Sequence, residues 1–189
     1  MELRQAKEFN FDRGFMMSSV FQDAKLTVSA AFLTSAAALP GLDQFRQVYE
    51  VNHHRVYAIA FWMTDNELAA EQVMRSSFEK ALALGVDSSE GIDRILISEL
   101  EELVVFNPPS LNCAPSTEVK SARQNTRRVD LERSVVQLPP TERLVFLMHD
   151  VEGYEHQHIA RLLDLTEIEC QHTLHQARLR IRELLAKLS

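Results

Sequence analysis

Apolar residues recur every three to four positions through most of the chain, which is the spacing of one face of an α-helix. The first such helix, Met16 to Leu39, is rich in alanine and stops at Pro40-Gly41, a pair that breaks helices. Three more are expected between residues 45 and 103, the middle one with its N-cap at Asp65. We expect all of them to pack as one bundle. Their apolar positions are Phe45, Val48, Tyr49, Val56, Ile59, Ala60 and Met63, then Ala70, Val73, Met74, Phe78, Ala81 and Leu82, then Ile92, Ile95, Leu96, Leu100 and Leu103.

The pattern fails after residue 106, where three prolines fall within residues 107–116. Such a stretch is typical of an interdomain linker. We therefore divide the chain into an N-terminal helical domain (1–106, with its bundle from about residue 42), a linker (107–117) and a C-terminal domain (118–189). The stretch after the linker carries Lys120, Arg123, Arg127 and Arg128. It is either a solvated helix face or a phosphate-contacting surface.

The C-terminal segment has the pattern of a helix-turn-helix. A helix opens at Pro140-Thr141, carries an apolar block from Leu144 to Met148, and is broken by Gly153. A short helix through Ile159 and Ala160 follows, then a turn at Asp164-Leu165-Thr166. Thr166 and Glu169 have the spacing of a capping box for the last helix. Its buried stripe is expected at Cys170, Leu174, Ala177, Ile181 and Leu184.

The early part of that last helix is the position from which a helix-turn-helix reads the major groove. An ordinary helical hairpin has the same spacing and remains the alternative. The fold prediction is all-α, with an N-terminal helix bundle and a C-terminal four-helix domain containing the helix-turn-helix. The exposed side chains expected beside the buried stripe are Gln171, His172, Thr173, His175, Gln176 and Arg178.

The distribution of charge limits the DNA-binding interpretation. The net charge of −7 lies in the first 110 residues, which hold sixteen acidic and nine basic side chains. The remainder holds eleven of each. DNA-binding proteins usually carry a basic surplus, so any DNA contact must come from a local patch. In the expected helix of residues 91–106, Glu99, Glu101 and Glu102 are predicted to face out.

Cysteines and histidines offer little chemistry by themselves. Cys113 and Cys170 are too few for a disulfide framework and indicate a reducing compartment. Cys170, His172 and His175 are close in sequence, but no zinc-binding spacing is present. His149-Asp150 and His53-His54 have no accompanying nucleophile, so we expect no enzyme activity, cofactor or metal. With no apolar run long enough for a membrane span and no signal sequence, we expect a cytoplasmic protein.

Residues 138–166, from Leu-Pro-Pro-Thr-Glu-Arg onward, resemble the C-terminal DNA-binding domain of extracytoplasmic-function (ECF) sigma factors. The ending Leu174-His-Gln-Ala-Arg178 is also similar to that family. Phe45-Arg-Gln-Val-Tyr, His54-Arg-Val-Tyr57 and the stretch from Ala70 to Leu82 are similar to the family's core-binding domain. The resemblance covers about residues 45–82 and 131–188.

This resemblance implies a sigma-factor-like regulator of transcription initiation whose partners are core RNA polymerase, promoter DNA and an anti-sigma-type regulatory protein. It implies DNA contacts and polymerase contacts by two separate sets of residues. The DNA-binding set is Thr166, Gln171, His172, Thr173, His175, Gln176, Arg178 and Arg180. The polymerase-binding set is Arg55, Glu71, Gln72, Arg75, Ser76 and Glu79.

Departures from the family keep a second hypothesis open. The family carries an aromatic residue and basic side chains where residues 91–106 have no Trp or Tyr and a single basic residue, Arg94. Single-stranded DNA is held by stacking groups and positive charge. The alternative is therefore a sigma-like interaction protein that binds a regulator or polymerase without opening promoters. A dimeric operator-binding repressor is a third option, but no dimer seam is visible. The Met/Phe-rich residues 9–21 either pack on the bundle or form a docking surface.

Overall fold

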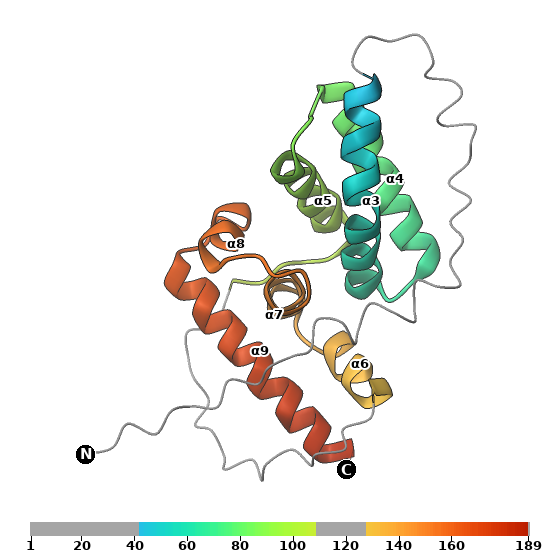
Figure 1. The fold of residues 1–189 in the computed structure, drawn as a ribbon. Helices are drawn as coiled ribbons and strands as arrows, with labels where there is room; N and C mark the ends of the chain where they lie inside the picture. Colours follow the sequence, from blue (N-terminus) through green and yellow to red (C-terminus); the bar gives the residue numbers. More distant parts are fainter. Residues whose placement is uncertain (1–41, 109–127, 189) are drawn as a thin grey trace. The chain divides into compact units, whose positions relative to one another are not determined.

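The computed structural model describes residues 42–108 and 128–188, and within these ranges it contains helices and no strands (Figure 1). The prediction of an all-α fold is confirmed. All described residues belong to one compact unit, Ala38–Ser189. The expected helix at 16–39, the Met/Phe-rich residues 9–21 and all but two residues of the predicted linker lie outside the described residues. The domain boundaries stay a prediction.

Three helices make up the N-terminal half: α3 (Leu42–Thr64), α4 (Glu67–Leu84) and α5 (Ser89–Leu103). Asn66 rather than Asp65 caps α4, since its side chain accepts a hydrogen bond from the backbone N–H of Ala69. Asp65 instead makes the turn, with a φ of 51°. Gly85, with a φ of 65°, ends α4 in the left-handed conformation that glycine adopts without strain.

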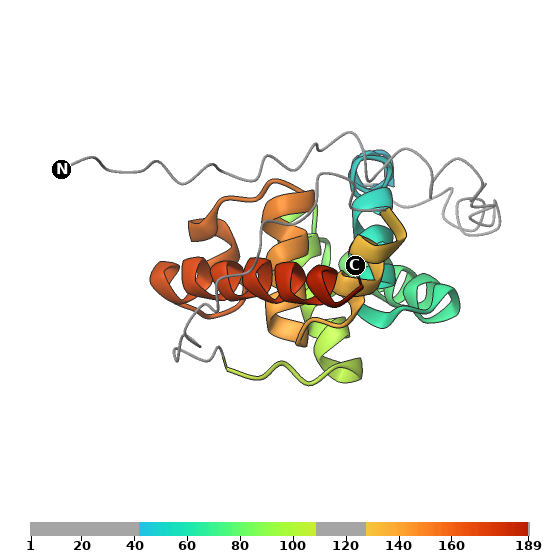
Figure 2. The ribbon, with the colours of Figure 1, turned by 90° about the horizontal axis from the view of Figure 1, so that it is seen from below.

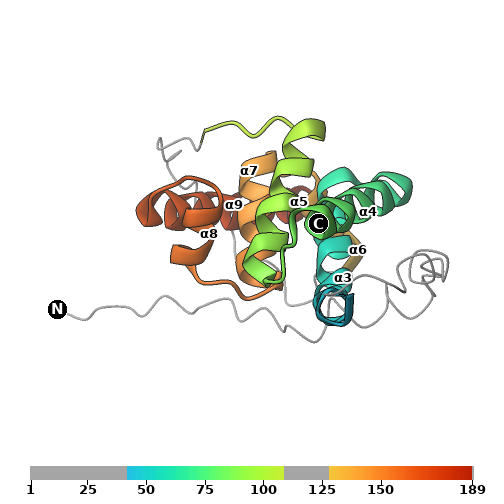
Figure 3. The same ribbon diagram turned by 90° about the horizontal axis from the view of Figure 1, so that it is seen from above.

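The apolar stripes of these helices are largely as predicted, and the buried residues meet between α3, α4 and α5. In α5, however, Ile97 is buried and Leu103 is exposed. Helix α5 contacts α3 and α4 and also reaches α8 of the C-terminal half. Seen from above, it lies between α4 and α8 (Figure 3).

The C-terminal half consists of α6 (Arg128–Val136), α7 (Pro140–Phe146), a π-helical turn η1 (Leu147–Val151), α8 (His156–Leu162) and α9 (Glu167–Leu188). Pro140 stands in the first turn of α7, where a missing N–H costs nothing. The apolar block from Leu144 to Met148 is buried as predicted. Gly153, with a φ of 79°, ends this helical stretch. Helix α9 packs along α6, α7 and α8 (Figure 2).

The capping box of the helix-turn-helix is confirmed. The backbone N–H of Glu169 donates to Thr166 Oγ1 (3.2 Å), and the backbone N–H of Thr166 donates to the carboxylate of Glu169 (2.8 Å). The turn before it uses Asp164 in the left-handed region, with a φ of 53°. Farther along α9, Leu185 rather than Leu184 completes the buried stripe.

The described helices include none that is both long enough and apolar enough to span a membrane.

Replacing Thr166 with Ala should lower the free energy of unfolding by about 1 kcal/mol, because the first turn of α9 loses its side-chain acceptor. Urea denaturation followed by circular dichroism measures this change. Thr166→Ser keeps the hydroxyl and is the matched control, which should stay close to the wild type. Equal loss in both variants would show that the methyl group, not the cap, stabilises this end.

Candidate nucleic-acid and polymerase interfaces

The predicted DNA-reading face of α9 is narrower than the sequence pattern suggests. Gln171 and His175 are exposed, and His172 is half-buried. Thr173 and Gln176, expected to be exposed, are only 2% and 9% exposed. Because α6, α7 and α8 all pack on α9, its buried face is wider than one stripe. The hydroxyl of Thr173 donates to the carbonyl of Glu169 (2.7 Å), so it is satisfied within the helix.

Both arginines predicted to contact DNA are held by carboxylates of the same half. Arg178 donates through Nε and Nη2 to the two oxygens of Asp150, at 2.9 and 2.6 Å. Arg180 pairs with Glu142 at 2.8 Å. Both ion pairs neutralise arginine charge that would otherwise attract the phosphates of DNA. The sequence pattern gave no sign of them, since Asp150 and Glu142 lie on a different helical stretch.

The pKa values of the two carboxyl groups differ in direction. Burial raises the pKa of Asp150, but hydrogen bonds from His149 and Arg178 outweigh it, so its pKa lies below the usual value. Burial raises the pKa of Glu142 above its usual value, and Arg180 offsets only part of that effect. Asp150 is therefore the firmer anion of the two, and it holds Arg178 with both oxygens.

Four of the predicted polymerase-contacting residues share one face of α4. Gln72, Arg75, Ser76 and Glu79 are separated by three, four and seven positions, which places them side by side on a helix. Gln72, Arg75 and Glu79 are exposed and Ser76 is half-buried. Glu71 stands beside this face and is half-buried.

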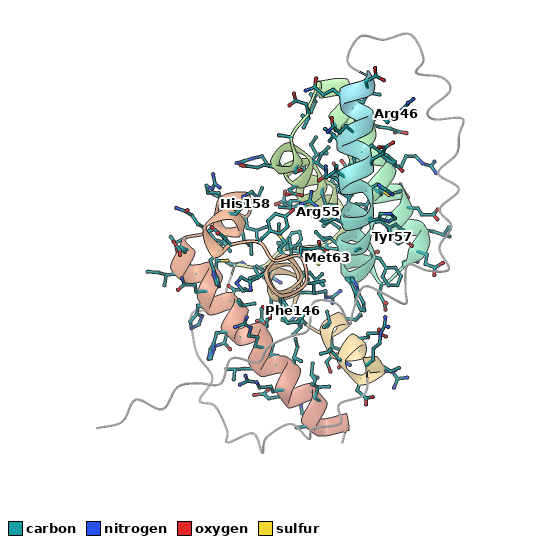
Figure 4. All side chains as sticks on the ribbon, viewed as in Figure 1. Arg46, Arg55, Tyr57, Met63, Phe146 and His158 are labelled. Carbon is teal, nitrogen blue, oxygen red and sulfur yellow. The ribbon has the colours of Figure 1, made fainter. Side chains whose placement is uncertain are left out.

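Arg55, assigned to the same set, lies elsewhere and is bound internally. Its guanidinium donates to Asp93 of α5 (3.0 Å) and to the side-chain oxygen of Asn52 (2.6 Å). It also stands over the ring of Tyr154, 5.3 Å from the centroid, a cation–π distance. Arg55 on α3 and His158 on α8 are both marked in Figure 4. The structure thus does not place Arg55 with the α4 residues.

The acidic surface predicted for α5 is partly internal. Glu99, expected to face out, is buried and forms an ion pair with Lys80 of α4. Asp93 is buried as well. Glu101 and Glu102 are exposed as predicted. Glu99 and Asp93 point inward because α5 packs against α3, α4 and α8. Glu99 meets Lys80 of α4, and Asp93 meets Arg55 of α3.

Asp93 was not among the candidate site residues identified from the sequence, although its spacing from apolar residues of α5 indicated that it would be buried. It stands four and seven positions before Ile97 and Leu100, both buried, so it falls on the apolar side of α5. Tyr154 donates to Asp93 Oδ2 (2.7 Å), and His158 Nε2 lies 3.9 Å from the same oxygen. Burial raises the pKa of Asp93 to about 7, although the cation of Arg55 acts in the opposite direction. The contacts of Asp93 with Tyr154 and His158 could not be predicted from helical spacing, because both residues are more than sixty positions away in the sequence.

Histidine and cysteine side chains do not converge on a metal site in residues 42–108 and 128–188: no group of three or more His, Cys, Asp or Glu could hold an ion there. Cys170 is buried as expected, and burial raises the pKa of its thiol to about 11. Of the basic stretch 120–128, only Arg128 is described; it pairs with Glu132 at 2.6 Å. Lys120, Arg123 and Arg127 lie outside the described residues.

Comparisons with known proteins agree with the helix-turn-helix. Residues 128–189 match the family described as Sigma-70, region 4. A solved structure, the sigma factor RpoE in complex with the anti-sigma factor NepR from Bartonella quintana, is similar in fold. It is 16% identical, with a TM-score of 0.57 over 75% of this chain and 96% of that one. No curated protein sequence gives a significant match.

Stability should depend on pH through Asp93. Its pKa is about 7 in the folded protein and about 4 when unfolded, so the folded state binds the extra proton between these values. The free energy of unfolding should therefore fall as pH rises from about 4 to 7 and level off above, by roughly 2–4 kcal/mol. Urea denaturation at pH 5 to 8 measures it. In Asp93→Asn the fall should be smaller, while the raised pKa values of Glu142 and Glu152 still contribute. Equal pH dependence in the two proteins would contradict the prediction.

Proposed function

We propose that this sigma-factor-like protein, a region 4 module on a sigma factor fold of the ECF type, binds core RNA polymerase and directs it to promoter DNA. The observation that carries the proposal is the helix-turn-helix itself. Helix α9 starts at a capped turn and presents Gln171 and His175 to solvent in its first half. These positions lie where a recognition helix meets the major groove.

The exposed groups of α9 suit recognition of base edges. A glutamine side chain both donates and accepts hydrogen bonds and can pair with adenine, and an imidazole can also bond a base edge. The role assigned to Thr166 is mainly structural, since its hydroxyl and its N–H both bond Glu169. We propose no direct base contact for Thr173 and Gln176, because both side chains are buried.

The polymerase contact is proposed for the face of α4 that carries Gln72, Arg75, Ser76 and Glu79. This face mixes one cation, one anion and two neutral polar groups, which favours a specific partner surface over non-specific attraction. Glu71 borders the face. Arg55 would join it only after leaving its contacts with Asp93 and Asn52.

The proposed role is regulatory and not catalytic, and it is carried out in the cytoplasm, where core polymerase and chromosomal DNA are found. A further proposed partner is a regulatory protein of the anti-sigma type. Its support is that the similar solved structure contains the sigma factor RpoE bound to such a protein.

A second candidate function rests on the arginine pairs. With Arg178 and Arg180 tied to Asp150 and Glu142, these two arginines of the recognition helix are less available to phosphates. Residues 91–106 also carry no Trp or Tyr for stacking on unpaired bases. A chain of this kind would bind polymerase or a regulator without opening promoter DNA.

The proposed function is tested by mixing the full chain with core polymerase and genomic DNA and sequencing the transcripts. We expect initiation at a defined subset of promoters. Gln171→Ala with His175→Ala should reduce discrimination between these promoters and other DNA by about tenfold or more, because two base-edge contacts are lost, while polymerase binding stays unchanged. Gln157→Ala, an exposed glutamine on α8, is the matched control. Polymerase binding without any specific transcript would favour the second candidate.

Neutralising Asp150, the carboxylate that binds Arg178, should strengthen DNA binding. In Asp150→Asn the guanidinium loses the carboxylate that binds it through two hydrogen bonds, so a phosphate meets less competition for Arg178. Duplex affinity should rise severalfold at low salt, and the slope of log K against log salt should steepen by about one. Fluorescence anisotropy across a salt series measures both. Glu183→Gln makes the same charge change at an exposed position of α9 and controls for net charge. A steepening of the same size in that control would show that Arg178 is not the contact.

A further inference from the structure

The first turn of α9 carries an apolar side chain, Ile168, that is 76% exposed. Of the large apolar side chains that are exposed in the described part of the chain, it is the one that belongs to α9. Single exposed apolar residues are common on protein surfaces. Ile168 is distinguished by its position, because the N-terminal residues of the second helix of a helix-turn-helix are the ones that contact base edges.

Stabilisation of the fold does not account for an isoleucine at this position. The acidic residues on either side of it both have partners at the start of α9. The carboxylate of Glu169 accepts from the N–H and the hydroxyl of Thr166, at 2.8 and 2.7 Å. The carboxylate of Glu167 accepts from Gln171 Nε2 at 3.3 Å. Ile168 takes part in neither contact and is not buried, and a β-branched residue favours a helix less than alanine does.

Ile168 shares one face of α9 with Gln171 and His175, which follow it by three and seven positions. Both of these side chains are exposed. Because an α-helix rises about 1.5 Å per residue, Ile168 and Gln171 are about 4.5 Å apart along the helix axis. Successive base pairs of DNA are about 3.4 Å apart. The two side chains therefore have a spacing that suits neighbouring base pairs.

The hydrogen bond between Gln171 and Glu167 leaves free the groups of the amide that pair with adenine. A glutamine amide has two N–H groups and one acceptor oxygen, and Glu167 accepts from one N–H. The other N–H and the oxygen can bond N7 and N6 of adenine in the major groove. Glu167 thus orients the amide of Gln171 and leaves it able to bind an adenine.

An apolar side chain beside this amide favours one base over the others. Thymine presents a methyl group in the major groove, and apolar side chains recognise it by direct contact. Adenine and guanine present hydrogen-bonding groups there, and cytosine presents an amino group. An isoleucine packed against those groups would remove them from water without giving them a partner, which is unfavourable. Ile168 is therefore suited to a thymine.

We propose that Ile168 is a specificity-determining residue that contacts the methyl group of a thymine, in the base pair next to the one whose adenine bonds Gln171. The DNA read by the start of α9 then contains two adjacent A·T pairs. Ile168 can make this contact only if α9 lies in the major groove, so its role rests on the proposed function. Ile168 does not belong to the DNA-binding set named from the sequence, which begins with Thr166 and continues at Gln171.

The test compares thymine with uracil, which lacks only the methyl group. The full chain, bound to core polymerase, selects from a library of randomised duplexes copied either with thymidine or with deoxyuridine triphosphate; core polymerase alone gives the background. In the thymine library the wild type should enrich a motif with two adjacent A·T pairs. In the uracil library the preference at one of these pairs should disappear. An unchanged preference would overturn the role of Ile168, whereas a wild type that enriches no motif at all would overturn the proposed function as well.

Ile168→Ala identifies the side chain that contacts the methyl group. The substitution is at an exposed position and introduces a better helix former, so the fold should be kept. Competition binding uses the enriched duplex and a copy in which a single uracil replaces the thymine. The wild type should bind the uracil duplex about fourfold more weakly, the factor expected for burial of one methyl group. Ile168→Ala should bind the two duplexes equally.

Val129→Ala is the matched control, because it shortens an exposed β-branched side chain in the first turn of α6. It should keep the wild-type difference between the thymine and uracil duplexes. If Ile168→Ala also keeps that difference, another residue contacts the methyl group and the role of Ile168 is overturned, while the proposed function stands.

Discussion

The arrangement of the described helices depends on the complete burial of the middle of α3. Five consecutive residues, Val56 to Ala60, are each no more than 7% exposed. Successive residues of an α-helix are 100° apart, so five in a row cover the whole circumference. A helix that is apolar all round must be covered on every side. Helices α4 and α5 cover one part, and α6, α7 and η1 contact α3 as well.

This enclosure explains why charged groups lie between the halves. Once α3 is covered by elements from both halves, its polar residues at the edge of the apolar region must find partners from both. Arg55 finds Asp93, and the terminal carbonyls of α3 find Arg143. The side chains of Arg55, Asp93 and Arg143 are all less than half exposed. Each has a polar partner, as a buried charge requires. The apolar contact holds the halves together, while the polar contacts fix their register and can be exchanged for water.

Local features of this fold could be predicted from the sequence because their causes are local. The capping box at Thr166 and Glu169, the breaker at Gly153 and the apolar block after Pro140 each depend on residues within one or two turns. The burial of Thr173, Gln176 and Glu99 could not be predicted in this way. Each of these positions is covered by a helix distant in the sequence, and a periodic pattern shows only one face, not how many neighbours will pack against it.

The ion pairs Arg178–Asp150 and Arg180–Glu142 could not be predicted either, because their members are distant in the sequence. They affect how α9 can bind DNA. Its first turn carries Glu167 and Glu169, and acidic groups there stabilise the positive end of the helix dipole. The same groups repel phosphates at the end that would enter the groove. Because Arg178 and Arg180 are also paired, they add little electrostatic attraction, and duplex recognition by the first half of α9 would depend on hydrogen bonds from Gln171 and His175. Such a surface binds DNA weakly by itself, so useful promoter affinity would require polymerase to hold the chain close to the DNA.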